Sequence, residues 1–494
     1  MGWECLPFEL HRKILQILIH DELESKLVAE YAVVCRSWQA QVEEINFQKL
    51  AVNQDDLTLL EQIVTGPRQT YLRHIRLNVE LPKYTNSLRY VPENEHEQET
   101  NNFRFTVALF ETFELLALWD TPDFWAARNG RGLDLELCAY SPSDKKHRLG
   151  ERSVDADGNS RFLDSLLDFH LLALEEPDGP HGLPLVNVVT GLFVLRRSYR
   201  NISAAALTPV IRSLPNLQEL RLESWMQIES RMQEDVDSGL YPRPPLPRAA
   251  HALLKRTLLL FEHFGAWAAM ITPGVNRTRH SYPYVSQQIR QFSTEVEEMS
   301  CSFIVDAVVF FEQFSRAGRN LQLPSLRLKP PYWPNLRWLT LTCYGFCHAT
   351  DPDRINDVLF SAAKGAKNMP KLLHMEIYNV NQHCAAVFRY LVIKNTALIS
   401  WTSTFDFKLD GTVKTLWKQV GHQSTRKEPI VFGEVRMANY GTIRQEGFIH
   451  SELATRELVL HRESSTDLME GRPFPDSVLP LQNLPPIVLP STET

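Results

Sequence analysis

The sequence has no excess of basic residues and no apolar run long enough to cross a membrane. Its 494 residues hold 52 Lys and Arg against 59 Asp and Glu, which gives a formal net charge of −7. A dedicated binder of nucleic acid or anionic membranes would concentrate basic residues on one face, so we expect neither partner. The most apolar stretch, Leu258 to Ile271, is interrupted by Glu262 and His263. It is too short and too polar for the ~20 residues that a bilayer needs.

Signals for secretion and for a disulfide framework are also missing. Residues 1–20 lack a basic start followed by an apolar run and a small-residue cleavage site, so they do not resemble a signal peptide. The seven cysteines are odd in number and scattered, which favours buried reduced thiols over paired ones. We therefore expect an intracellular protein of the cytoplasm, the nucleus or both.

No motif of a known catalytic centre is present. The chain has no Walker A loop, dinucleotide fingerprint, zincin motif, kinase set or G-x-S-x-G elbow. Cys343, Cys347 and His348, with His383 and Cys384, could gather around zinc, but the C-x-x-C pairs typical of structural sites are missing. Buried cysteines on strands explain these residues better. We predict a protein that is not an enzyme, with no cofactor and no metal, and keep an unrecognised hydrolase as a distant alternative.

The first fifty residues predict a small helical module. Pro7 suits the first turn of a helix, and a second helix is expected from about Lys26 to Glu44. In each, apolar residues recur at four-residue steps: Leu10, Ile14 and Leu18 in the first, Val34, Trp38 and Val42 in the second. Helices totalling about 45 residues cannot bury all their apolar surface alone. The module therefore needs a partner surface.

The same residues carry a resemblance to a known family. The string L-P-x-E-L-x-x-x-I-L, followed about twenty residues later by V-C-R-x-W, resembles the F-box, the helical module that docks onto the Skp-type adaptor of cullin-RING ubiquitin ligases. The match covers about residues 4–48. By this resemblance, the adaptor contact and the packing behind it would involve Leu6, Pro7, Leu10, Ile14, Leu15, Val34, Cys35 and Trp38. The alternative is a helical hairpin that caps the next domain.

Beyond residue 50 a second pattern recurs, a proline or turn followed by Leu-x-x-apolar-x-apolar. It predicts short strands that start near 187, 217, 256, 298, 336, 372 and 398, with weaker copies at Leu72 and Leu133. Amphipathic stretches precede several of them: Phe105–Trp119, Ala204–Leu214, Ile304–Phe314 and Ile355–Lys367. Helix followed by strand, without hairpin signals, predicts parallel strands with crossover helices.

The spacing of the strands suggests the architecture. Steps of roughly 25–45 residues are typical of solenoid repeats, although a broad open α/β sheet stays possible. We predict an α/β protein with a small all-α F-box module followed by an irregular leucine-rich-repeat-like solenoid of parallel strands. The continuous face of such an array is suited to binding a large partner.

The domain boundaries follow from these patterns. We predict a helical module at 1–50, an α/β body at 51–471 with a possible sub-boundary near 232–250, and a Pro-rich extended tail at 472–494. Thr85–Thr100, Ser141–Ser160 and Met232–Arg248 read as insertions or linkers. The local basic cluster of Arg196, Arg197, Arg200 and Arg212 is expected to be a solvated rim, with recognition of an acidic or phosphorylated degron as the alternative.

The body adds a resemblance of its own. The segments W-P-N-L-R-x-L-x-L-T from Trp333, M-P-K-L-x-x-M-E-I-Y-N from Met369 and A-x-V-F-R-Y from Ala385 are similar to filamentous-fungal F-box proteins with an uncharacterised C-terminal domain. This resemblance implies a substrate-recognition subunit of an SCF-type ubiquitin ligase, which binds the Skp-type adaptor, through it cullin, and an unknown protein target. The alternative is a scaffold that works outside ubiquitin chemistry.

Overall fold

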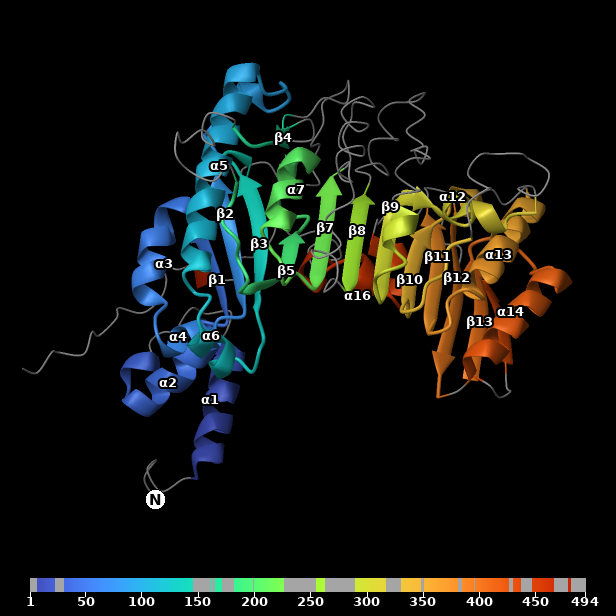
Figure 1. Ribbon diagram of the computed structural model, residues 1–494, viewed down its shortest axis with the longest axis horizontal. Coiled ribbons are helices and arrows are strands. Elements are labelled where there is room, and N and C mark those ends of the chain that lie inside the picture. Colours follow the sequence, from blue (N-terminus) through green and yellow to red (C-terminus); the bar gives the residue numbers. More distant parts are fainter. Residues whose placement is uncertain are drawn as a thin grey trace, which may run out of the picture.

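The computed structural model describes residues 7–22, 31–144, 161, 165–170, 182–198, 200–225, 255–262, 289–316, 330–347, 351–380, 384–394, 396–425, 430–436, 447–465 and 479–480. Among these residues one 13-stranded sheet runs along the long axis of the molecule (Figure 1). The predicted α/β class with parallel strands is confirmed.

Neighbouring strands of the large sheet follow one another in the chain. In order they are β1 (Lys49–Asn53), β2 (His74–Glu80), β3 (Leu133–Tyr140), β5 (Val189–Val194), β7 (Glu219–Trp225), β8 (Arg256–Glu262), β9 (Glu298–Asp306), β10 (Trp338–Thr342), β11 (His374–Val380), β12 (Ala385–Ile393), β13 (Thr396–Ser403) and β14 (Ile430–Arg436). The last strand, β15 (Leu479–Pro480), returns to pair with β1. A separate two-stranded sheet joins β4 (Leu166–Leu167) to β6 (Asn201–Ile202).

The predicted strand positions are confirmed, with the seven expected starts each within two residues of an observed one. The expectation of parallel strands throughout is wrong at one end, because β12 is antiparallel to both β11 and β13. Only Lys394 and Asn395 connect β12 to β13, and Lys394 has a φ of 48°. Two-residue hairpin loops favour this left-handed backbone conformation.

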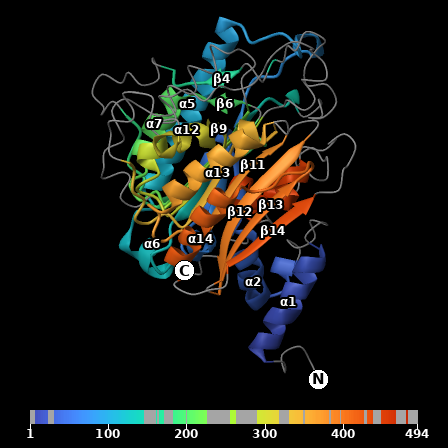
Figure 2. The same ribbon diagram turned by 90° about the vertical axis from the view of Figure 1, so that its right-hand side faces the viewer.

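Helices cover one face of the sheet (Figures 1 and 2). They are α3 (Leu57–Ile63), α5 (Glu95–Ala117), α7 (Ala204–Arg212), α13 (Pro352–Ala366) and α14 (Gly411–Thr425). Two short helices, α4 (Pro67–Tyr71) and α6 (Pro122–Ala127), lie toward the amino-terminal ends of the strands, and α12 (Ala307–Phe310) follows β9. Because these helices lie on a single face, the opposite face of the sheet is not covered by them.

Two predictions about helices need correction. Thr85–Thr100 is not wholly a linker, because α5 begins at Glu95, where the side chains of Asn94 and Glu97 each bond the other's backbone N–H in a capping box. The helix expected over Ile304–Phe314 is mostly absent. Strand β9 runs to Asp306, whose carboxylate caps the four-residue α12.

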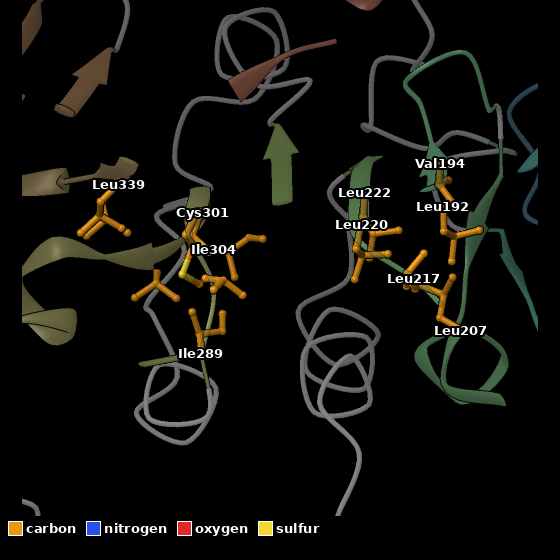
Figure 3. Packing of buried hydrophobic residues seen from close by; sticks show 14 of the residues in the cluster. Leu192, Val194, Leu207, Leu217, Leu220, Leu222, Ile289, Cys301, Ile304 and Leu339 are labelled. Carbon is orange, nitrogen blue, oxygen red and sulfur yellow. The ribbon is translucent and has the colours of Figure 1, made fainter. Parts of the chain in front are cut away.

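Leucines at alternate strand positions form the core between sheet and helices. Leu192 of β5 and Leu220 of β7 point toward Leu207 of α7, and Cys301 of β9 and Leu339 of β10 continue the layer (Figure 3). Each fully buried aliphatic side chain contributes about 1.5–3 kcal/mol relative to exposure. Burial of this layer fixes which face of every strand meets the helices.

Candidate functional site

The N-terminal helices α1 (Phe8–Glu22) and α2 (Arg36–Asn46) lie at the amino-terminal end of the strands, beside α4 (Figures 1 and 2). They have a small core of their own, in which Tyr31 and Ile45 pack against the buried Ala32 and Val42. An ion pair of 2.7 Å between Glu43 of α2 and Arg68 of α4 joins them to the body. Burial raises the pKa of Glu43, but its hydrogen bonds to Arg68 and Gln39 outweigh this effect and lower it.

Several apolar side chains of this module face solvent. The exposed fractions are 46% for Leu10, 53% for Ile17, 62% for Val33 and 58% for Val34. Of the other residues expected at the adaptor contact, Pro7 and Cys35 are exposed and Ile14 and Trp38 are partly buried. Leu6 and the side chain of Leu15 fall outside the described residues. The structure thus leaves an uncovered apolar surface where the sequence predicts a partner.

The second helix begins later than predicted. It starts at Arg36 instead of Lys26, and Cys35 before it is extended, with φ −165° and ψ 166°. Val34 and Cys35 therefore belong to the turn that precedes the helix. The helical spacing of Val34, Trp38 and Val42 does not describe this segment, because an extended residue at position 35 interrupts the helical repeat.

The face of the sheet opposite the helices is polar. Strand register places one residue from each strand from β2 to β12 in a single row, in which most members are polar or charged: Arg76, Glu136, Phe193, Arg221, Leu258, Ser300, Thr340, Glu376 and Arg389. We call this row and the residues beside it the polar face. Within it, Arg389 lies 2.6 Å from Glu376, and Arg197 lies 3.1 Å from Glu136.

The C-terminal segment 447–465, which we call the strap, runs across the polar face. It contains α15 (Gly447–Glu452) and α16 (Arg456–Val459), and Figure 1 shows α16 on the side of the sheet away from the helices. The backbone N–H of Thr455 donates to Glu376 at 2.8 Å, and that of His461 donates to Glu223 at 2.6 Å. Further along, Ser464 Oγ donates to Glu223 at 2.5 Å.

Two arginines of the sheet donate hydrogen bonds to backbone carbonyls of the strap. Arg389 donates to the carbonyl of Glu452 at 2.6 Å, and Arg221 donates to that of Glu457 at 2.8 Å. Along the strap, successive residues contact β12, then β11, then β7, which is opposite to the order of these strands in the chain. Beyond the strap, β15 pairs with β1. The strap covers the polar face from one part of the sheet to the other.

The far end of the strap is anchored by charge. Glu463 forms ion pairs with Arg197 and with Lys49, the second at 3.2 Å. Burial raises the pKa of Glu463, but Arg197 and Lys49 outweigh burial and lower it to about 2. Burial lowers the pKa of His461, as it does that of His450, which falls to about 4. The strap thus carries an ionised glutamate and neutral histidines at neutral pH.

The predicted basic cluster is not a solvated rim. Arg196, Arg197 and Arg200 are at most 6% exposed, and only Arg212 is on the surface. Arg200 lies 3.1 Å from both Glu93 and Asp144. Because Arg197 and Arg200 already hold carboxylates of this chain, the cluster is not a free site for an acidic degron.

The described cysteines other than Cys35 are buried, and there is no cluster of metal ligands among the described residues. Burial raises the pKa values of the Cys301 and Cys343 thiols far above the ordinary value, so neither supplies a reactive thiolate. In the described part of the chain, no three His, Cys, Asp or Glu residues come together as metal ligands. Cys347, His348 and His383, part of the zinc alternative, lie outside the described side chains. No described helix has the length and apolar character of a membrane span.

One family model matches this chain. It is a family of unknown function (DUF6546), and the match spans residues 251–461. A search of curated proteins found no match. The predicted C-terminal domain of unknown function agrees with this finding, whereas no F-box family matches residues 1–50. The matched region runs from β8 to His461, and so includes both half of the sheet and most of the strap that covers it.

The polar face was not predicted, although the sequence carries a signal for it. Glu136 and Glu376 each stand between two apolar residues inside a strand, and Glu223 follows Leu222 inside another. A carboxylate in such a position is costly to bury unless it is paired, and all three are at most 1% exposed. These glutamates therefore indicate that one face of the sheet is lined by polar groups that pair with them.

Proposed function

We propose that this protein is a substrate-recognition subunit of an SCF-type ubiquitin ligase, in which the N-terminal module binds the Skp-type adaptor and the body holds a protein target. The observation that carries the proposal is the exposure of Leu10, Ile17, Val33 and Val34. These residues belong to the segment whose motif resembles the F-box. A cluster of exposed apolar side chains is typical of an interaction site.

The body supports this role by its shape. Its strands follow chain order across one long sheet, as expected of a leucine-rich-repeat-like solenoid with a long binding face. The protein would bring a target within reach of the conjugating enzyme and would itself supply no reacting group. Proximity alone can account for a large rate increase.

The alternative is a scaffold whose helical hairpin caps the solenoid. A cap would cover the outer strand of the array. Here that place beside β1 is taken by β15, while α2 contacts α4. The arrangement favours the adaptor-binding role over the cap.

Co-purification with a recombinant Skp-type adaptor tests the proposal. The double variant Leu10→Ser, Val34→Ser should lose about 2–4 kcal/mol of binding energy, or roughly 30- to 1,000-fold in affinity, because two side chains no longer bury apolar area. Both positions are exposed in the free chain, so folding should be unchanged.

The matched control is Leu118→Ser, Leu185→Ser, since these leucines are 69% and 65% exposed on the body. This control should bind the adaptor as the unmodified chain does. Unchanged affinity of the Leu10, Val34 variant would contradict the proposal. Unfolding of the body after deletion of residues 1–46 would favour the cap instead.

A further inference from the structure

The two faces of the sheet are built differently. Leu135, Leu137, Leu222 and Ile377 face the helices as one apolar layer, whereas the opposite face of the same strands carries Glu136, Arg221, Glu223 and Glu376, with the apolar Tyr378 at one end. Parallel sheets that are permanently covered on both sides have strands that are apolar on both faces. Alternation of apolar and charged residues is typical of a sheet with one face open to water or to a polar partner.

The charges of the polar face are balanced within the sheet itself. Glu376 pairs with Arg389 at 2.6 Å, Glu223 lies 3.5 Å from Arg221, and Glu136 lies 2.9 Å from His74. Removal of the strap would therefore expose ion pairs to water and would not leave bare charges in an apolar layer. The charged part of the face is therefore suited to exist uncovered, while Tyr378, Ala385 and Val387 at one end would present an apolar patch that a partner's apolar residues can cover.

The strap is held in the way that a bound peptide is held. Its backbone N–H groups at Ala454, Thr455 and His461 donate to sheet carboxylates, and its carbonyls at Glu452 and Glu457 accept from sheet arginines. Main-chain bonds of this kind supply affinity for an extended chain, and side-chain contacts supply selectivity.

Three side-chain features of the strap define what the face accepts. Thr455 donates its hydroxyl to Glu376 and accepts from Thr340. Apolar residues follow, with Val459 and Leu460 buried against the ends of β11 and β12. Glu463 then meets Arg197 and Lys49, which makes an acidic residue complementary to that end of the face.

We propose that the polar face is a binding site for an extended segment of a partner protein and that the strap occupies this site as an internal competitor. The partner segment carries a Ser or Thr for Glu376, apolar residues three to five positions later, and an acidic residue for Arg197 eight positions later, as the strap does. This inference rests on the proposed function in one respect: if the protein is a ligase subunit, the partner is the ligase target.

The test uses the full chain with a weakened strap. Thr455→Val, Ser464→Ala removes hydroxyl donors to Glu376 and Glu223 without changing the sheet. Each hydrogen bond to a charged group corresponds to about a 10- to 100-fold change in local opening, so with two bonds removed the amides of residues 453–464 should exchange at least about 10-fold faster. The control Thr415→Val removes an exposed hydroxyl of α14 and should change nothing in the strap.

A labelled peptide of residues 447–465 then probes the uncovered face by fluorescence anisotropy. It should bind the weakened-strap variant about 10-fold more tightly than the unmodified chain, because affinity rises with the fraction of open face. Adding Glu376→Gln to that variant should abolish the gain, and a peptide carrying Thr455→Val should bind weakly.

Two results would overturn the inference. One is strap exchange that occurs only with global unfolding in every variant, which would make the strap a permanent part of the core. The other is faster strap exchange without binding of the peptide. Adaptor binding is measured in the same preparations. If the unmodified chain does not bind the adaptor while the peptide binds the weakened-strap variant, the result counts against the proposed function alone.

Discussion

Replacement of Glu463 by Gln removes the charge that holds one end of the strap to Arg197 and Lys49. The pKa of Glu463 falls from its ordinary value of 4.5 to about 2, because the two cations outweigh the effect of burial. Since the pKa is lower in the closed strap, the stabilisation is present above about pH 4.5 and is lost as the pH falls through about 2. This difference in pKa corresponds to about 3 kcal/mol at neutral pH.

Native-state hydrogen exchange of the backbone amides from His461 to Ser465 measures this energy. At about pH 7 these amides should exchange up to ~300-fold faster in Glu463→Gln than in the unmodified chain, and at about pH 3 the ratio should fall to ~10-fold. Glu136 on β3 is present in both proteins. His461 on the strap is coupled to this carboxylate, because each favours the charged form of the other, so the comparison is made with His461→Gln in both proteins to remove its titration from the ratio. The control Glu61→Gln changes an exposed carboxylate of α3 and should give a ratio near one at both pH values. A ratio for Glu463→Gln that does not change with pH would refute the reasoning.

Two further predictions concern the scaffold. A Cβ added at Gly365 of α13 would lie 2.6 Å from Cδ1 of Phe311. Gly365→Ala should therefore lower the free energy of unfolding, measured in urea, by about 1–3 kcal/mol. The control is Gly345→Ala, where the nearest atom is 3.5 Å away, and it should lower the free energy of unfolding far less. Asn94→Ala removes the cap of α5, which Glu97 shares, and should cost about 1 kcal/mol; a thermal unfolding midpoint equal to that of the unmodified chain would contradict this role.

The sequence was informative about the elements because their causes are local. A leucine at every second strand position must face the core, so the starts of β7, β10 and β11 could be placed within two residues. The short connection at Lys394 and the capping box at Asn94 are equally local signals, and they were overlooked. The exposed Leu10 and Val34 follow from a module too small to bury its own apolar residues.

The roles of the polar residues depend on contacts between segments that are far apart in the chain. Glu223 bonds to His461 and Ser464, which are more than two hundred residues away in the chain, and such a pairing has no periodicity or spacing that a sequence could reveal. Arg197 looked like a surface residue because its charge is visible in the sequence, while its partners Glu136 and Glu463 lie on distant segments. Which strands form, and which of their faces is apolar, could be predicted from the residue pattern, since both depend on neighbours within a few residues. The strap that closes over the polar face depends on register across the whole sheet, so it exists only in the folded chain.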